Sequence, residues 1–242
     1  MIDLKYIITG TGRCGTVYMA RLLTSVGIPC GHETIFDNLG IGAAQMKIAG
    51  LSPMGISRIS LMEYQAAKDQ WVSVPDWSGD LKNIVADSSY MAAPYLEQFP
   101  NAKIVQVTRN PIKVIDSFVN HLDYFFHHYP TNQWEHFIYQ HLPELTEEMH
   151  GYDRAALFYI LWNQMIESHA DLRCKIEDGP DAVLEFVGRA DQPHFNEKIN
   201  SVRKRNARVF TLDSIESKEI ANRLKQKADE YGYKITSEYL MI

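Results

Sequence analysis

Cysteine is scarce in this chain, and long hydrophobic runs are lacking. The 242 residues include three cysteines, Cys14, Cys30 and Cys174, without CxxC spacing. So small and odd a set argues against a disulfide framework and a zinc site, and reduced thiols are typical of the cytoplasm. No secretory signal peptide is visible, and the longest hydrophobic runs are too short to span a membrane. We therefore expect a cytoplasmic protein without a membrane segment.

Positive charge is also in short supply. Lysine and arginine total 24 against 30 aspartates and glutamates, so the formal net charge is −6. Nucleic acid is therefore not an expected partner, and a polyanionic ligand would need local basic residues. Low-complexity tracts and internal repeats are lacking, while 45% hydrophobic residues suffice for a core. We expect a single α/β domain over 1–242, with an acceptor-side insert around 120–151 that is rich in histidine, proline and aromatics.

Short hydrophobic runs alternate with helical patterns. The predicted strands are 4–10, 28–33, 71–77, 83–86, 103–108 and 173–178. The predicted helices are 15–27, 38–56, 91–100, 112–126, 152–172, 180–188 and 216–231. Asn110 is a good N-cap before Pro111 at the first helical position. The alternation predicts a three-layer α/β/α fold around a mostly parallel sheet, with ligands at the carboxyl ends of the strands. Polar residues follow Thr9, Ala86 and Thr108 at those ends.

A glycine-rich loop, Gly10 to Thr16, joins the first strand to the first helix. Its inward N–H groups and the helix dipole would form an anion site, and Arg13 adds a permanent positive charge. The spacing of Gly10 and Gly15-Thr16 nearly matches a P-loop. However, the lysine that nucleotide kinases and ATPases place before the serine or threonine is missing. The loop favours a P-loop NTPase-like fold; an ordinary glycine-rich turn is the alternative.

The stretch "GRCGT" resembles the 5′-phosphosulfate loop of sulfotransferases that use 3′-phosphoadenosine 5′-phosphosulfate (PAPS), above all the bacterial and tyrosylprotein types. That loop carries Lys or Arg, a small residue, Gly and Ser or Thr. Here Cys14 replaces the usual serine, and Val17 departs from a second hydroxyl found in many members. The resemblance implies that PAPS is bound by Thr11, Gly12, Arg13, Cys14, Gly15, Thr16 and Val17.

A second motif, "VTRNPIKVIDSF", resembles the 3′-phosphate site of the same family, in which an arginine ends a strand and a serine follows eight residues later. Arg109 and Ser117 match it. A surface arginine and a helix serine bonded to its own turn are the alternatives. A late basic segment, "INSVRKRNAR", resembles a family loop that closes on this phosphate, and Arg203 is its leading candidate. A solvated basic face is the alternative there.

The stretch "CGHETIF" resembles the position of the family's general base. Glu33 would accept the proton of the acceptor hydroxyl, and His32 is the alternative base because other branches use histidine. Arg13 would stabilise the charge that develops on the leaving nucleotide. An ordinary surface glutamate is the other reading of Glu33.

The resemblance implies in-line, metal-independent transfer of a sulfuryl group from PAPS to a hydroxyl of a carbohydrate, a phenol or a peptide tyrosine. His121, His127 and His128 invite a metal site, but their spacing fits none, and an aromatic acceptor pocket or lid is favoured. One alternative is a P-loop kinase or NTPase, with Asp87 as the Mg²⁺ carboxylate. Another is a non-catalytic nucleotide-binding protein of the same fold.

Overall fold

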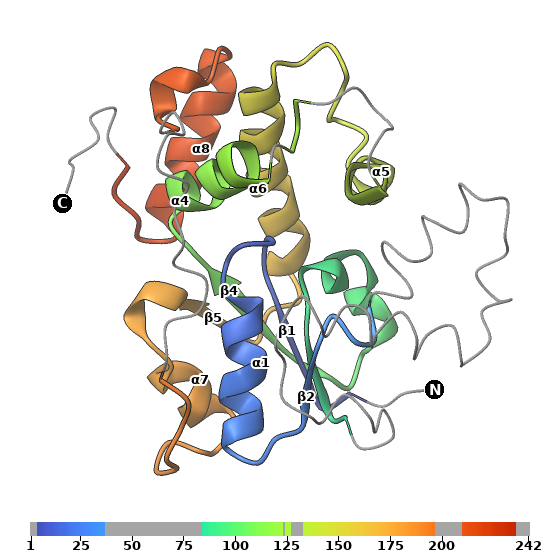
Figure 1. Cartoon of the computed structure of the whole chain (residues 1–242), viewed down its shortest axis with the longest axis vertical. Helices are drawn as coiled ribbons and strands as arrows, with labels where there is room; N and C mark the ends of the chain where they lie inside the picture. The colour runs from blue at the N-terminus through green and yellow to red at the C-terminus, as the bar shows by residue number, and fades with distance from the viewer. Residues whose placement is uncertain (1–3, 37–83, 123, 127–132, 197–209, 236–242) are drawn as a thin grey trace, which may run out of the picture.

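A parallel β-sheet forms the centre of the molecule in the computed structural model, which describes residues 4–36, 84–122, 124–126, 133–196 and 210–235. Within these residues the sheet has five strands in the order β2-β3-β1-β4-β5. All four neighbouring pairs are parallel. The strands are β1 (Tyr6–Thr9), β2 (Cys30–His32), β3 (Ala86–Ser88), β4 (Lys103–Thr108) and β5 (Leu172–Lys175). Their carboxyl ends therefore meet at one edge, as Figure 1 shows.

Helices cover both faces of the sheet. Alternate residues of a strand point to opposite faces, and Ile8 and Ile7 accordingly belong to different hydrophobic clusters. The Ile8 cluster includes side chains of α1 (Thr16–Ser25) and α7 (Asp181–Phe186). The Ile7 cluster includes side chains of α4 (Pro111–Asp116), α6 (Gly151–Glu167) and α8 (Lys218–Glu230). The three-layer α/β/α prediction is thus confirmed.

The third strand lies later than the hydrophobic pattern predicts. β3 runs over Ala86–Ser88 instead of 83–86, and it pairs with both β1 and β2. Asp87 and Ser88 are fully buried although they are polar. Backbone groups supply their partners: the Asp87 carboxylate accepts N–H bonds, and the Ser88 hydroxyl donates to the Thr16 carbonyl oxygen. These long-range contacts allow the strand to end at Ser88, two residues after the predicted end at 86.

Three helix predictions also need correction. Residues Tyr90–Gln98 form a 3₁₀ helix, η3, with Pro94 inside it; proline lacks the N–H that an α-helix would use there. The helix predicted over 112–126 is α4 followed by a π-helical turn, η4 (Ser117–His121). Helix α6 ends at Glu167 and not at 172, where β5 begins. A 3₁₀ turn, η5 (Ile176–Asp178), replaces the end of the predicted strand 173–178.

The helix start at Asn110-Pro111 is confirmed. The Asn110 side-chain oxygen accepts the N–H of Ile112 at 3.0 Å, and Pro111 occupies the first turn. The predictions for 38–56 and 71–77 fall outside the described residues.

The described part of the segment 120–151 packs into the Ile7 cluster. Phe125 is fully buried and contacts the rings of Phe118 and Phe158. Helix α5 (Gln133–His141) buries Phe137 against Trp162 of α6. These aromatic side chains therefore support the core beside the sheet edge.

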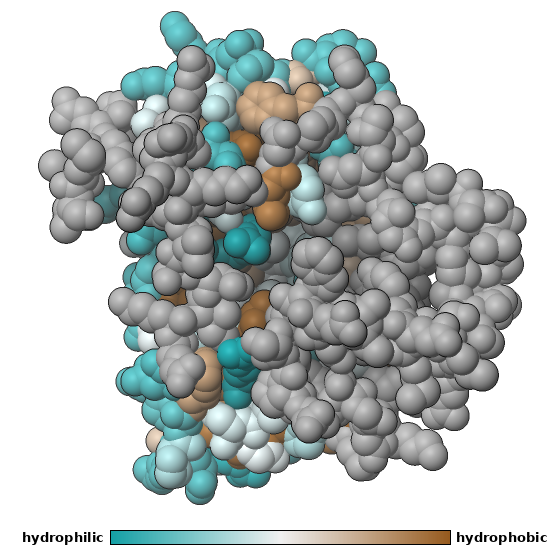
Figure 2. Space-filling view, viewed as in Figure 1, coloured by the Kyte–Doolittle hydropathy of each residue, from teal (hydrophilic) through white to brown (hydrophobic). Residues whose placement is uncertain are grey.

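The described surface shows little exposed hydrophobic area. In Figure 2 hydrophilic side chains gather at both ends of the described surface, and hydrophobic ones appear between them in small separate groups. Among the described residues, the large hydrophobic side chains that are exposed are Leu122 and Phe126. No helix in the described ranges has the length and hydrophobicity needed to cross a membrane.

Candidate functional site

The glycine loop joins the carboxyl end of β1 to the amino end of α1 (Figure 1). A Cβ atom on Gly10 would lie 2.1 Å from the Val107 carbonyl oxygen, so only glycine allows the loop to pass so close to β4. Gly15 is the N-cap of α1 with φ 110°, and no side chain caps it. The first N–H groups of α1 therefore have no side-chain cap at Gly15, and such groups bind anions at many helix N-termini.

Arg13 makes the turn in the loop and spans the site. Its φ of 67° lies in the left-handed region, which is uncommon for a residue with a side chain. Its Nε donates to the Ser117 hydroxyl at 2.9 Å, across 104 residues of chain. Ser117, at the start of the η4 turn, therefore faces the loop and meets Arg13 through its hydroxyl.

Arg109 lies beside Arg13 at the carboxyl end of β4. Its Nη1 donates to the Arg13 carbonyl oxygen at 2.8 Å, and the Tyr159 hydroxyl donates to the Arg109 carbonyl oxygen at 2.9 Å. Burial, followed by the charge of Arg109, lowers the pKa of Arg13 from its ordinary value. Two partly buried guanidinium groups so close together favour an anion between or beside them.

The remaining loop residues are packed against the fold. Thr11 and Thr16 are buried, and Cys14 is fully buried. Burial raises the pKa of the Cys14 thiol to about 12. At neutral pH Cys14 is therefore a thiol, and it contributes its backbone and its volume to the loop. Val17 lies in the first turn of α1 and is partly buried.

His32 and Glu33 lie together at the carboxyl end of β2. The His32 Nε2 is 3.2 Å from the Thr16 Oγ1 and 3.8 Å from the Glu33 Oε1. The His32 side chain is 8% exposed and that of Glu33 is 15% exposed. Glu33 has φ 55°, a second left-handed residue with a side chain. The structure thus brings His32 to the first residue of α1, with the Glu33 carboxylate beside the His32 ring.

Asp87 has a different position from the one that a metal ligand would need. Its carboxylate accepts the backbone N–H groups of Thr34, Ile35 and Phe36 at 3.2, 2.8 and 3.3 Å. It is fully buried beneath the segment that follows Glu33. In the described ranges, no three or more His, Cys, Asp or Glu side chains gather as they would to hold a metal ion.

Some contributors were missed from the sequence. The Tyr159 hydroxyl donates to the Arg109 carbonyl oxygen and the Ser88 hydroxyl donates to the Thr16 carbonyl oxygen, and no motif signals such contacts. Tyr124 stacks on Phe118, and burial raises the pKa of its phenol, opposed by the charge of Arg13. Glu177 accepts the Asn110 N–H at 3.1 Å and so connects η5 to the start of α4.

Other predicted residues lie outside what the structure describes. Arg203 and the basic residues around it are outside the described ranges, as are His127 and His128. The backbone of His121 is described as the last residue of η4, and its side chain is not.

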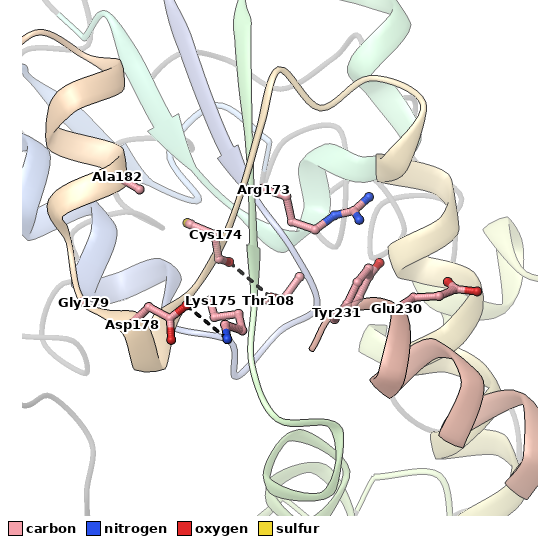
Figure 3. Close-up of a pocket in the computed structure, with 9 residues that line it drawn as sticks. All are labelled: Thr108, Arg173, Cys174, Lys175, Asp178, Gly179, Ala182, Glu230 and Tyr231. Carbon is pink, nitrogen blue, oxygen red and sulfur yellow. Dashed lines mark hydrogen bonds and ion pairs between the residues drawn. The ribbon is translucent and has the colours of Figure 1, made fainter. Parts of the chain in front are cut away.

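A separate pocket of about 260 Å³ lies on the β5 side of the sheet edge (Figure 3). Arg173 and Lys175 line it together with Asp178 and Glu230, and Lys175 pairs with Asp178 at 3.2 Å. This pocket combines both charge signs and does not include Arg13 or Arg109, so it is distinct from the loop site.

No protein-family model and no curated protein matches the sequence. Three solved structures are similar over 97% of this chain. The sulfotransferase domain of the curacin biosynthetic pathway is 13% identical, with TM-score 0.45 over 99% of its length. The sulfotransferase from Alicyclobacillus acidocaldarius is 14% identical, with TM-score 0.47 over 98%. The sulfotransferase domain of the Synechococcus PCC 7002 olefin synthase is 14% identical, with TM-score 0.44 over 96%.

Proposed function

We propose that the protein is a sulfotransferase that moves a sulfuryl group from PAPS to an acceptor hydroxyl without a metal ion. The convergence of Arg13, Arg109 and Ser117 at the amino end of α1 carries this proposal. A chain with net charge −6 concentrates two cations there, and the loop itself lacks the P-loop lysine. Fixed guanidinium groups can stabilise a polyanion where other P-loop proteins use lysine and Mg²⁺.

The donor would be held at both of its phosphate ends. The loop amides, from Thr11 through Gly12, Cys14, Gly15 and Thr16 to Val17, would hold the 5′-phosphosulfate with Arg13. Arg109 and Ser117 would hold the 3′-phosphate, with Arg203 as a further candidate. The 2.9 Å bond between Arg13 and Ser117 supports this arrangement because it brings the two predicted phosphate sites side by side.

Glu33 would act as the general base. The acceptor oxygen attacks sulfur, its proton passes to the Glu33 carboxylate, and the bond from sulfur to the bridging phosphate oxygen breaks. The electron pair of that bond remains on the 5′-phosphate of the leaving nucleotide, where Arg13 would stabilise the developing charge. The proximity of His32 to Thr16 and Glu33 supports a role in orienting the base, and His32 remains the alternative base.

Transfer would be direct. The Cys14 thiol, whose pKa burial raises to about 12, would be too poor a nucleophile at neutral pH to carry the group. Positioning and charge stabilisation would supply most of the catalysis, as in phosphoryl transfer. The residues that surround the acceptor next to Glu33 would determine whether it is a carbohydrate, a phenol or a peptide tyrosine.

The kinase or NTPase alternative has less support. It needs a carboxylate at a strand end for Mg²⁺, and Asp87 directs both of its oxygens to backbone N–H groups. A non-catalytic nucleotide-binding protein would need the donor site without the base, whereas His32 contacts Thr16 of the loop and Glu33 lies beside His32.

Turnover of PAPS in the presence of EDTA tests the proposal. The wild type is incubated with 4-nitrophenol, N-acetylglucosamine and a tyrosine peptide, and release of adenosine 3′,5′-bisphosphate is followed. We expect transfer to at least one acceptor and a loss of kcat on the order of 10²- to 10⁴-fold in Glu33→Gln. Glu185→Gln on α7 is the matched control and should leave kcat unchanged.

Two outcomes would contradict the assignments. Undiminished turnover by Glu33→Gln, with loss of turnover in His32→Asn, would make His32 the base. No turnover by the wild type with any of the three acceptors would favour the non-catalytic alternative.

A further inference from the structure

Asp87 is a buried carboxylate next to the proposed active site. It lies at the centre of β3, between β1 and β2, opposite Ile7 on one side and Gly31 on the other. It is fully buried. Burying a charged carboxylate costs free energy unless hydrogen bonds stabilise its charge. The hydrogen-bond partners of Asp87 therefore indicate its role.

Three successive backbone N–H groups donate to the Asp87 carboxylate. The Thr34 N–H reaches Oδ1 at 3.2 Å, and the Ile35 and Phe36 N–H groups reach Oδ2 at 2.8 and 3.3 Å. Such a run of N–H groups around one anion is a nest, a backbone conformation that an anion holds in place. Here the anion belongs to the protein itself, more than 50 residues away along the chain.

Glu33 immediately precedes this nest and has a strained backbone. Its φ of 55° is disfavoured for any residue with a Cβ atom and persists only where the surroundings impose it. Its own N–H donates to the Ser88 carbonyl oxygen at 3.2 Å. β3 therefore fixes the backbone on both sides of Glu33, by the Ser88 carbonyl oxygen and the Asp87 carboxylate.

Gly31 provides the space for this carboxylate. A Cβ atom on Gly31 would lie 2.6 Å from the Asp87 Oδ1 and 2.6 Å from the Thr34 Oγ1. A methyl group at position 31 would therefore displace either the carboxylate or the turn that it binds.

We propose that Asp87 is a positioning residue that holds Glu33 in its left-handed conformation and so directs the Glu33 carboxylate toward the acceptor. This inference rests on the proposed function for the role of Glu33. Asp87 itself contacts neither donor nor acceptor; it acts through the backbone of 33–36. Without it, the turn relaxes and the base leaves its reacting position.

The test compares Asp87→Asn with the wild type in catalysis and in donor binding. Asparagine keeps the shape but presents one neutral oxygen to three N–H groups. We expect kcat for the best of the three acceptors above to fall on the order of 10- to 100-fold, as misplaced catalytic groups do. The affinity for adenosine 3′,5′-bisphosphate should be unchanged, because the loop at 10–16 is untouched. Asp87→Asn/Glu33→Gln should be no slower than Glu33→Gln alone.

Asp153→Asn is the matched control. Asp153 is a buried aspartate of α6 whose oxygens accept the Glu216 and Ser217 N–H groups at 2.8 and 3.1 Å. Its replacement should lower the melting temperature as Asp87→Asn does, without lowering kcat. Equal losses of kcat in both variants, or additive losses in the double variant, would overturn the proposal and reduce Asp87 to a stabilising residue.

A crystal structure of Asp87→Asn separates this proposal from the proposed function. We expect the Glu33 φ to leave the left-handed region whether or not the wild type shows turnover. Retention of that conformation would overturn the positioning role, whereas absence of turnover in the wild type would count against the function alone. If Asp87→Asn does not fold, Gly31→Ala replaces it, because the added methyl group would displace the same carboxylate. Its kcat, its affinity for adenosine 3′,5′-bisphosphate and its Glu33 φ are then measured in the same way.

Discussion

Replacing Arg109 with alanine tests whether the proposed donor site recognises the 3′-phosphate of its nucleotide. The change removes a guanidinium whose Nη1 donates to the Arg13 carbonyl oxygen at 2.8 Å. Hydrogen bonds to charged groups contribute about 1.5–3 kcal/mol. At about 1.36 kcal/mol per tenfold change, Arg109→Ala should weaken binding of adenosine 3′,5′-bisphosphate roughly 10- to 150-fold.

Comparing two nucleotides shows whether Arg109 binds the 3′-phosphate or only holds the loop. AMP lacks the 3′-phosphate, so a guanidinium that binds this phosphate should favour the bisphosphate over AMP, and Arg109→Ala should lose that preference. An arginine that only holds the loop through the Arg13 carbonyl oxygen should weaken both ligands equally. Isothermal titration calorimetry with the two nucleotides distinguishes the two roles.

Arg223→Ala on α8 is the control, since it removes the same charge outside the site. Binding of adenosine 3′,5′-bisphosphate by Arg109→Ala as tight as that by Arg223→Ala would rule out a role of Arg109 in the donor site. Arg109 would then be the strand-end surface arginine of the alternative reading.

Two further predictions concern stability. Gly10→Ala should lower the free energy of unfolding, measured in urea, by about 3 kcal/mol, because the added Cβ atom would lie 2.1 Å from the Val107 carbonyl oxygen. Gly27→Ala is the control, since a Cβ atom there has no neighbour within 4 Å. It should lower the free energy of unfolding by only about 1 kcal/mol, because of the left-handed backbone at position 27. Burial raises the pKa of the Cys14 and Cys174 thiols to about 12, from 9.0. Because unfolded thiols ionise first, stability should be constant in this respect below about pH 9 and fall as the pH rises toward 12. Urea unfolding near pH 7.5 and pH 10.5 measures this, and equal or greater stability at the higher pH would contradict it.

Local chemistry made much of the fold predictable. The strands β1 and β4, the loop after β1 and the Asn110-Pro111 helix start each depend on residues close together in the sequence, and each lies where the pattern predicts. The boundary of β3 did not follow this rule. Its last two residues are polar and buried, because partners far along the chain satisfy them.

The candidate site divides in the same way. The sequence motifs singled out Arg13, Arg109 and Ser117, and the structure brings them together through side-chain contacts. No spacing rule predicts that Arg13 bonds Ser117 directly, since 104 residues separate them. From the sequence, Asp87 is a candidate Mg²⁺ ligand of a kinase or NTPase because it follows a predicted strand end. The hydrogen bonds of Asp87 to backbone N–H groups depend on how the chain turns after β2. No local sequence pattern predicts this tertiary arrangement.

Calorimetry of the wild-type protein in EDTA shows whether arginines, in place of a lysine and Mg²⁺, hold the donor nucleotide. We expect binding of adenosine 3′,5′-bisphosphate that EDTA does not weaken, and little binding of ATP with or without Mg²⁺. Binding of ATP only with Mg²⁺, and none of adenosine 3′,5′-bisphosphate, would contradict it.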